Sequence, residues 1–383
     1  MDLHLNEEHE MIRKMAREFA LKELAPIAAE IDEQGRVPME NVRKMGELGF
    51  LGLTVEEAYG GAGADTIAYV IAVEEIAKVC ASTATIMSVQ NSLVCQGFEL
   101  FGDEAQKRAY LPRLATGELI GAFALTEPEA GCDAAAVRTT ARRDGDSYVL
   151  DGTKHFITNG GIADIVLVFA STNPSLGGRG ISAFIVEKTT PGFAVGREEN
   201  KMGIRGTSTC ELNFQDCRVP ASRRVGAEGQ GLKMALAILD GGRIGIAAQA
   251  VGIAQGALEA AIKYAQARRQ FGQPIASFQA IQWMLADMNT RIEAARLLTY
   301  QAALAKDQAK RSGERYSREA AQAKLFASET AVWVTNRAIQ IHGGYGYMKD
   351  YPVERFYRDA KITELYEGTS EVQRMVIASA LLR

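Results

Sequence analysis

The sequence has few residues of the kinds that build metal sites and disulfide frameworks. Its 383 residues include five cysteines and four histidines, and the cysteines form no CxxC pair. A zinc site needs Cys or His ligands at close, regular spacing, and a disulfide framework needs many cysteines in a short chain. We therefore expect no metal site and no disulfide, with thiols kept reduced as in a cytosol.

The chain also lacks a strong charge of one sign and a long apolar run. Its net charge is −4 and its basic residues are scattered, so no electrostatic footprint for nucleic acid is present. No run of roughly 18 apolar residues occurs, and residues 1–19 are charged and amphipathic without an apolar signal region. These features predict a cytoplasmic protein with neither a nucleic-acid partner nor a membrane segment.

Hydrophobic residues make up 47% of the chain, enough for about two to three cores. In the first part they recur at helical spacing, in the segments 6–35, 38–50, 65–80, 83–100 and 103–116. From about 121 to 220 the pattern changes to short β-type runs separated by turn signals such as Asp144-Gly145. Strands at this spacing without helices between them are typical of an antiparallel barrel or sandwich.

Helical spacing then returns in four long segments, 231–267, 277–307, 317–341 and 351–381. Four long helices favour a bundle. The order therefore predicts an α+β multidomain chain, with an all-α domain at 1–120, a β domain at 121–230 and a helical bundle at 231–383.

Two glycine-rich segments resemble nucleotide-binding loops without meeting the requirements of one. Residues 59–63 are not followed by the Lys-Ser/Thr of a phosphate loop. Residues 226–231 lie where the strand region gives way to helix, but they form only a lone glycine pattern and not a full Rossmann fingerprint. We expect a plain loop and a linker, respectively. A dinucleotide bound here would not be bound in the Rossmann manner.

Seven further motifs carry a family resemblance over essentially the whole chain. They are LTEPEAGCDA (125–134), KHFITNGG (154–161), KMGIRGTSTCEL (201–212), DGGRIGIAAQAVGIAQGAL (240–258), RRQFGQPI (268–275), QIHGGYGY (340–347) and RDAKITELYEGTSEVQR (358–374). In this order and spacing they resemble the acyl-CoA dehydrogenases, most closely the short-chain (butyryl-CoA) branch. The resemblance implies an antiparallel β-barrel between the two helical domains, a C-terminal four-helix bundle, FAD as cofactor and an acyl-CoA substrate. It also implies electron-transferring flavoprotein as a partner, and a homotetramer.

Glu367 aligns with the catalytic base of this branch. Burial beside a flavin and an acyl chain would disfavour its charged form and raise its pKa towards neutrality. On residue type alone it could equally be a surface glutamate between helices. Gly242 occupies a position where other branches carry an alternative glutamate, so the resemblance implies no second base.

The resemblance assigns a set of residues to FAD: Phe123, Leu125, Thr126, Phe156, Thr158, Arg268, Gln270, Phe271, Gln279, Gln340, Gly343, Gly344, Thr369 and Glu371. Those around Thr126 and Phe156 would flank the flavin ring. Many relatives carry tryptophan in place of Phe156, so the aromatic packing survives but the indole donor is lost. Arg268 would offer its planar fork of donors to the pyrophosphate, partly across a subunit interface.

For the acyl-CoA, the resemblance assigns Cys132, Asp240, Arg243 and Gly368. Cys132 stands where relatives carry Ser or Thr, which puts that hydrogen bond in doubt because a thiol is a weak donor. We expect the pocket depth to depend on residues around Met87, Gln90, Asn91 and Leu93. His342, where relatives often place Phe or Leu, is expected to serve in packing.

Several alternatives share these residues. The same site could run as an enoyl-CoA reductase, or accept branched or cyclic acyl groups. An acyl-CoA oxidase or flavin monooxygenase of the same fold would let oxygen reach the reduced flavin. A non-catalytic flavin or CoA-binding scaffold is the remaining alternative, and the presence of Glu367 argues against it.

Overall fold

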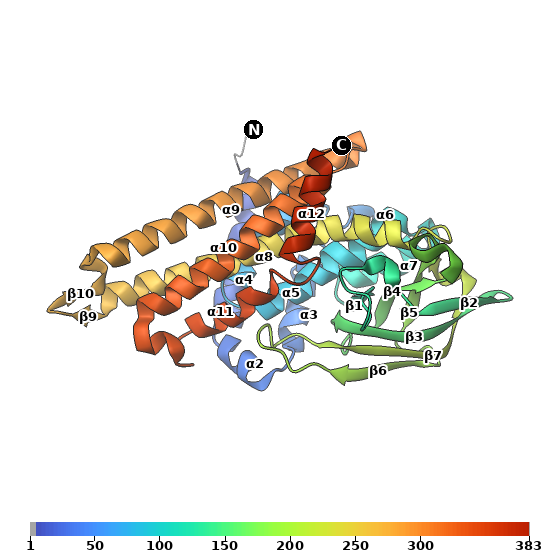
Figure 1. Cartoon of the computed structure of the whole chain (residues 1–383), viewed down its shortest axis with the longest axis horizontal. Helices are drawn as coiled ribbons and strands as arrows, with labels where there is room; N and C mark the ends of the chain where they lie inside the picture. The colour runs from blue at the N-terminus through green and yellow to red at the C-terminus, as the bar shows by residue number, and fades with distance from the viewer. Residues whose placement is uncertain (1–4, 383) are drawn as a thin grey trace.

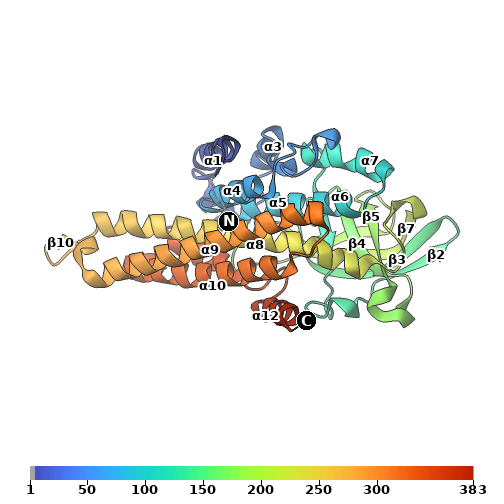
Figure 2. The same cartoon turned by 90° about the horizontal axis from the view of Figure 1, so that it is seen from above.

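The computed structural model describes residues 5–382, so the first four residues of the charged N-terminal segment and Arg383 lie outside the described part. The chain is elongated, with long helices forming one end and a twisted sheet the other (Figures 1 and 2). The predicted order of a helical part, a sheet part and a second helical part is confirmed.

The N-terminal part is helical as predicted. Its helices are α1 (Glu7–Phe19), α2 (Ala28–Gln34), α3 (Met39–Glu47), α4 (Thr66–Ala77), α5 (Ala81–Ser88), α6 (Gln96–Phe101) and α7 (Glu104–Ala115). Capping boxes begin α1 and α7, where Asn6 and Asp103 accept from the backbone amides three residues on. Two π-helical turns, Ala20–Leu24 and Val89–Cys95, follow α1 and α5 directly.

The middle part is a mixed eight-stranded sheet. Its strands are β1 (Gly121–Ala124), β2 (Thr140–Asp144), β3 (Ser147–Thr158), β4 (Ile165–Ser171), β5 (Ile181–Glu187), β6 (Phe193–Glu198), β7 (Thr209–Pro220) and β8 (Arg224–Val225). The hydrogen-bonded path runs β6-β7-β3-β2-β4-β5-β8, and β1 pairs with β4 off this path.

The prediction of an antiparallel sheet was wrong for two strand pairs, because β1 and β2 both run parallel to β4. β4 is buried on both faces, as its continuous apolar run IVLVFAS allows. Ile165, Leu167 and Phe169 pack in the core shared with the helices, while the alternate residues face the second core within the sheet. Apolar patterning reports such burial but not strand direction. Closure of the sheet into a barrel is not confirmed, since no pairing of β6 with β8 occurs among residues 5–382.

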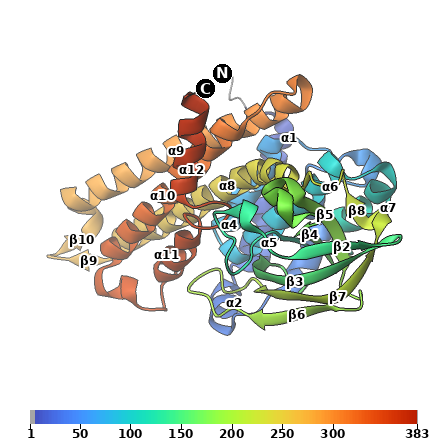
Figure 3. The ribbon, with the colours of Figure 1, turned by 45° about the vertical axis from the view of Figure 1, so that its right-hand side comes forward.

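The C-terminal part contains three long helices, α8 (Gly231–Ala267), α9 (Gln279–Ser312) and α10 (Ser317–His342), which lie side by side in Figures 2 and 3. A hairpin of β9 (Arg269–Gln270) and β10 (Gln273–Pro274) joins α8 to α9. The predicted fourth helix over 351–381 was wrong. It is two helices, α11 (Val353–Ile362) and α12 (Ser370–Leu381). Glu367 and Gly368 between them have φ of +55° and +98°, which an α-helix cannot contain.

α8 is the central helix of the fold. By length and composition it could cross a membrane, but 78% of its most apolar stretch is buried inside the protein, as in the core helix of a globular fold. Its glycines allow neighbouring helices to approach closely: a Cβ at Gly252 would overlap the Glu74 carbonyl of α4. The close approach of α4 to α8 therefore depends on a glycine at this position.

Candidate active site

Glu367 lies on the loop that separates α11 from α12, with its carboxylate turned into the protein. Its Oε2 atom is buried and has no hydrogen-bond partner among the described residues. Burial raises the pKa of this carboxyl to about 7, and the opposing charges of Lys324 and Arg243 only partly counter that rise. The site therefore holds a buried carboxyl group with a free oxygen and a pKa near neutrality.

The backbone of this loop is held by buried side chains from other elements. Lys324 Nζ donates to the Gly368 carbonyl at 2.7 Å, and Gln373 Nε2 donates to the same oxygen at 2.8 Å. The Tyr366 hydroxyl donates to Gln249 Oε1 on α8. Since Glu367 is a non-glycine residue in the left-handed region, these contacts hold a conformation that the residue would otherwise seldom adopt.

Gly242 of α8 faces the Glu367 carboxylate. A Cβ at this position would overlap Oε2 of Glu367 and lie 2.7 Å from Cδ2 of Leu93. The absence of a side chain at residue 242 is therefore what leaves room for the carboxylate of Glu367. The same contact places Leu93, one of the residues expected to set pocket depth, next to the candidate base.

The other residues expected to set pocket depth are engaged elsewhere. Gln90 donates to the carbonyls of Leu114 and Leu119, each at 2.9 Å, and accepts from the Gly121 amide. Asn91 bonds the backbone at residues 50, 53 and 87. Both amides thus tie the π-helical turn to neighbouring segments, and Met87 is fully buried in the helical core.

Among the residues assigned to the acyl-CoA, Asp240, Arg243 and Gly368 come together with Glu367. Arg243 is 5% exposed, pairs with Asp240 at 2.6 Å and donates to the Glu367 carbonyl at 3.5 Å. Asp240 also accepts from the Ser317 hydroxyl of α10. These bonds lie within the protein, so contact of Arg243 with CoA stays a prediction. Cys132 is exposed on the loop between β1 and β2.

The residues assigned to the flavin ring come together on adjoining segments. Lys154 Nζ donates to the Leu125 carbonyl at 2.9 Å, and the His155 amide donates to the Thr126 carbonyl at 2.9 Å. Phe156, with φ of +57°, is 59% exposed and stacks on His155 at 4.0 Å between ring centroids.

The neighbouring candidates are less exposed. Phe123 of β1 is half-buried against Phe169, at 4.9 Å between ring centroids, and Thr158 ends β3. The exposed ring of Phe156 therefore lies on a segment that adjoins the partly exposed, polar Thr126. Such an arrangement fits a planar, polar-edged heterocycle.

A buried ion pair that the sequence did not reveal underlies this surface. Lys154 is fully buried and its ammonium lies 2.7 Å from Glu127 Oε1. Glu127 also accepts from the amides of Arg138 and Thr139, at 2.6 and 3.0 Å. The pair therefore ties β3 to both ends of the loop that carries Thr126 and Cys132. The only sign of this pair in the sequence is that Glu127 and Lys154 each lie in one of the seven motifs.

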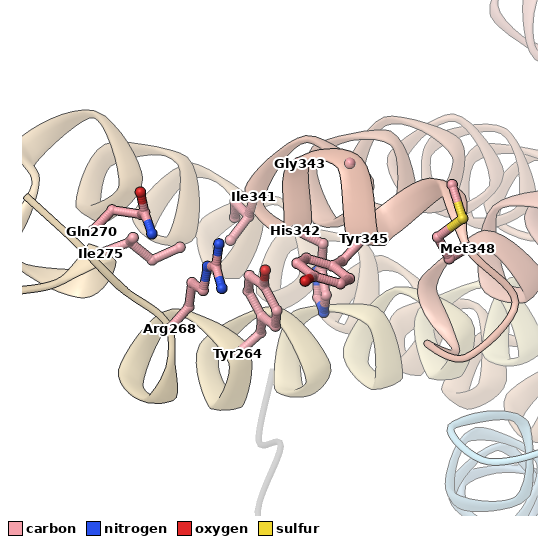
Figure 4. Close-up of a pocket in the computed structure, with 10 residues that line it drawn as sticks. Tyr264, Arg268, Gln270, Ile275, Ile341, His342, Gly343, Tyr345 and Met348 are labelled. Atoms are coloured by element: carbon pink, nitrogen blue, oxygen red, sulfur yellow. The ribbon is translucent and has the colours of Figure 1, made fainter.

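A second group of candidates lines a pocket of about 560 Å³ at the end of the bundle remote from the sheet (Figure 4). It is lined by Arg268 and Gln270, where α8 gives way to the hairpin, and by Gly343 and Gly344, which follow α10. The Arg268 guanidinium lies 5.3 Å from the ring centroid of Tyr345. Such a pocket offers a cation, an aromatic face and open backbone, which suits a nucleotide phosphate or base.

The remaining candidates lie around this pocket or at α12. Phe271 is 91% exposed at the tip of the hairpin, while Gln279 begins α9 and Gln340 lies in the last turn of α10, both exposed. Thr369 caps α12 by accepting from the Val372 amide at 3.4 Å, and Glu371 lies in the first turn of that helix.

His342 serves in packing, as expected. Its ring stacks on Tyr264 at 4.2 Å between centroids, and Nδ1 lies 2.8 Å from the Ala338 carbonyl. Burial lowers its pKa, which favours the neutral ring.

Three family models match the chain in order. They describe the N-terminal, middle and C-terminal domains of acyl-CoA dehydrogenase and match residues 6–118, 122–217 and 229–382. Among curated relatives, the short-chain specific acyl-CoA dehydrogenase of Clostridium acetobutylicum is 53% identical over 100% of both chains. The acryloyl-CoA reductase (NADH) of Anaerotignum propionicum is 52% identical over 100% of this chain and 96% of the relative.

Two solved structures are similarly close. Butyryl-CoA dehydrogenase from Megasphaera elsdenii is 49% identical, with a TM-score of 0.97 over 100% of both chains. A chain from a solved structure in a study of the electron transferring flavoprotein of Acidaminococcus fermentans is 52% identical, again with a TM-score of 0.97 over 100% of both chains. With models spanning the chain and relatives at this identity, the chain belongs to the acyl-CoA dehydrogenase family of FAD-dependent oxidoreductases.

Proposed function

We propose that this protein oxidises a short-chain acyl-CoA to the trans-2-enoyl-CoA, with Glu367 as the base that removes the α-proton. The observation that carries the proposal is the buried, unpartnered Oε2 of Glu367, on a carboxyl group whose pKa is raised to about 7. A thioester α-proton is weakly acidic, so a base whose pKa lies near the working pH combines ionisation at that pH with useful basicity.

The protein's own residues supply binding, orientation and proton transfer. Oε2 of Glu367 accepts the proton from the α-carbon, and the backbone amide of Glu367 is our candidate donor to the thioester oxygen, where negative charge develops. Gly242 leaves the space in which the carboxylate lies. FAD held beside the segments of Thr126 and Phe156 would supply the oxidation, because its flavin ring can take up the β-hydride.

We place the flavin ring beside the segments of Thr126 and Phe156, and the pyrophosphate and adenine at the pocket of Arg268 and Gly344. Within one chain these sites are far apart. Arg268 follows Gly242 by about 26 residues of α8, or about 39 Å of helix. A dinucleotide whose ring lay beside Glu367 could not reach Arg268 of the same chain. This separation supports an oligomer in which a neighbouring subunit completes each FAD site, and the family resemblance makes a homotetramer the proposed assembly.

Other parts of the proposal rest on the family resemblance. Electron-transferring flavoprotein is the proposed electron acceptor, and the cytoplasm the proposed location. The proposed domains are 1–120, 121–230 and 231–383, with the middle domain a barrel. Thr369 and Glu371 are proposed as further FAD contacts, and Cys132 as a residue near the CoA.

The test is anaerobic reduction of the FAD-loaded enzyme by butyryl-CoA, followed by flavin absorbance, in the wild type and in Glu367→Gln. We expect the wild-type flavin to bleach and that of the variant to stay oxidised. Glu364→Gln is the matched control, because Glu364 lies on the same loop but pairs with Lys361 at 2.5 Å; it should still bleach. Bleaching in Glu367→Gln at the wild-type rate would refute Glu367 as the base.

The resemblance to acryloyl-CoA reductase makes the reverse direction the second candidate. Reoxidation of the reduced enzyme by a 2-enoyl-CoA, faster than its reduction by the saturated acyl-CoA, would favour it. Rapid reoxidation by molecular oxygen would instead favour an oxidase.

A further inference from the structure

Lys324 of α10 is a buried lysine beside the candidate active site. Its side chain is 0% exposed. Burial lowers the pKa of its ammonium to about 8, with the charge of Glu367 acting in the opposite direction. A buried ammonium is costly unless its donors and its charge are compensated. The partners of Lys324 therefore indicate what the residue does.

The ammonium donates a hydrogen bond to a neutral group, the Gly368 carbonyl, at 2.7 Å. Among residues 5–382, no carboxylate lies within 4.0 Å of it to form an ion pair. The carboxylate that it chiefly faces is that of Glu367, which precedes the bonded carbonyl by one residue in the strained loop. Lys324 is thus hydrogen-bonded to the backbone of the loop between α11 and α12, while its charge acts on Glu367, the candidate base.

The other charges around Glu367 make Lys324 the principal cation there. Arg243 of α8 also faces Glu367, but it is paired with Asp240 at 2.6 Å. Tyr69 of α4 and Tyr366 of the loop face Glu367 as well; burial raises the pKa of Tyr69 to about 12 and that of Tyr366 still further, so both are neutral near pH 7.

Lys324 itself faces the charges of Glu367, Arg243, Glu364 and Glu371. Glu371 is exposed, and Glu364 is paired with Lys361, so solvent and that pairing weaken their effect on Lys324.

We propose that Lys324 is a positioning residue for the reaction: it fixes the Gly368 carbonyl, and its buried charge keeps the neighbouring Glu367 carboxylate ionised. The inference rests on the proposed role of Glu367 as the base. The hydrogen bond and the charge of Lys324 can be measured separately. The hydrogen bond affects the limiting rate, and the charge affects the pH at which the rate falls.

Gln373 provides a matched control, since its Nε2 donates to the same Gly368 oxygen at 2.8 Å without carrying a charge. The experiment measures the rate of flavin reduction by butyryl-CoA in the holoenzyme between pH 5 and pH 10. The variants are Lys324→Met, Lys324→Gln, Lys324→Arg and Gln373→Leu.

The expected results separate charge from hydrogen bonding. Removing the positive charge in Lys324→Met and Lys324→Gln should raise the pKa of Glu367 further. The acid limb of the profile should then move to higher pH by on the order of one unit. Lys324→Arg keeps the charge and should keep the wild-type limb. Gln373→Leu should lower the limiting rate without moving the limb.

Four outcomes decide the matter. An acid limb in Lys324→Gln that superimposes on the wild type would overturn the inference, and so would an equal shift in Gln373→Leu. If Lys324→Met fails to bind FAD, the comparison of Lys324→Gln with Lys324→Arg still tests the inference. Equal shifts of the acid limb in these two variants would also overturn the inference. Full activity of Glu367→Gln would instead remove the proposed base, which distinguishes failure of the proposed function from failure of the role of Lys324.

Discussion

Replacing Glu367 by glutamine should stabilise the protein while abolishing its activity. Burial of this carboxyl raises its pKa to about 7, whereas in the unfolded chain it is near 4.5. A carboxyl group whose folded pKa is raised destabilises the fold when it is ionised. This cost is absent below the unfolded pKa and fully present above the folded pKa. Glutamine is nearly isosteric and never ionises, so it avoids that cost.

The magnitude follows from the two pKa values. A difference of about 2.5 units at about 1.4 kcal/mol per unit gives roughly 3 kcal/mol at pH 8, falling to under about 1 kcal/mol at pH 5. Part of this gain is offset because Lys324, which faces Glu367, loses the anion near its buried ammonium. We therefore expect the variant to be more stable than the wild type by about 2 kcal/mol at pH 8.

The assay is urea unfolding at pH 5 and pH 8, at fixed protein and FAD concentrations because both affect apparent stability. Both tryptophans, Trp283 and Trp333, lie in the C-terminal bundle, so their fluorescence reports on the part of the fold that carries Glu367. Glu40→Gln is the control. Its carboxyl has a pKa lowered by a hydrogen bond from Arg36, so its removal should not stabilise the protein at pH 8. A stability difference between Glu367→Gln and wild type that is the same at both pH values would refute the reasoning.

Three further predictions concern the groups that shape the site. Gly242→Ala places a methyl group on the Glu367 carboxylate, so we expect flavin reduction to slow on the order of 100-fold with FAD retained; a wild-type rate in stopped-flow would contradict this. Tyr366→Phe leaves the Gln249 oxygen without its donor and should lower the unfolding free energy by about 1 to 3 kcal/mol in urea, the prediction failing if stability is unchanged. Lys154→Met leaves Glu127 buried without its cation, so we expect FAD to bind at least about tenfold more weakly in a fluorescence titration. Unchanged affinity would show that the ion pair does not order the flavin-facing loop.

Helical periodicity predicted most of the fold because the helices are long and their apolar faces are local features of the sequence. It failed where a local conformation is held by distant contacts. The segment 351–381 has helical spacing throughout, yet residues 363–369 leave the helix, since Lys324 and Gln373 bind the Gly368 carbonyl and stabilise positive φ at Glu367. In the sheet, β-type runs were found, but the parallel pairing of β1 with β4 depends on segments about 40 residues apart.

The candidate site was predictable only as far as the family motifs reach. Glu367 was located by its motif, and its burial was expected from the chemistry. Lys324 was missed because it bonds a residue 44 positions away, and a lysine within an alanine-rich helix looks like an ordinary surface cation. The Lys154–Glu127 pair, 27 positions apart, was missed for the same reason. Arg243 was expected to face CoA; it pairs with Asp240 and donates to the Glu367 carbonyl, and its contact with CoA stays a prediction.

Lys324 and Lys154, which the sequence did not reveal, share a physical role. Each holds polar groups in positions that the rest of the fold would not maintain. An unpartnered carboxylate oxygen, a glycine that leaves space for it and a left-handed glutamate each cost stability. Two buried lysines, each bonded to a backbone carbonyl, stand directly behind the two candidate surfaces: Lys324 behind the loop of Glu367 and Lys154 behind the segment of Thr126. Lys324 also places a positive charge near the candidate base, whereas the charge of Lys154 is paired with Glu127. A buried lysine that bonds a backbone carbonyl next to a candidate site therefore indicates where the backbone of that site is held in place.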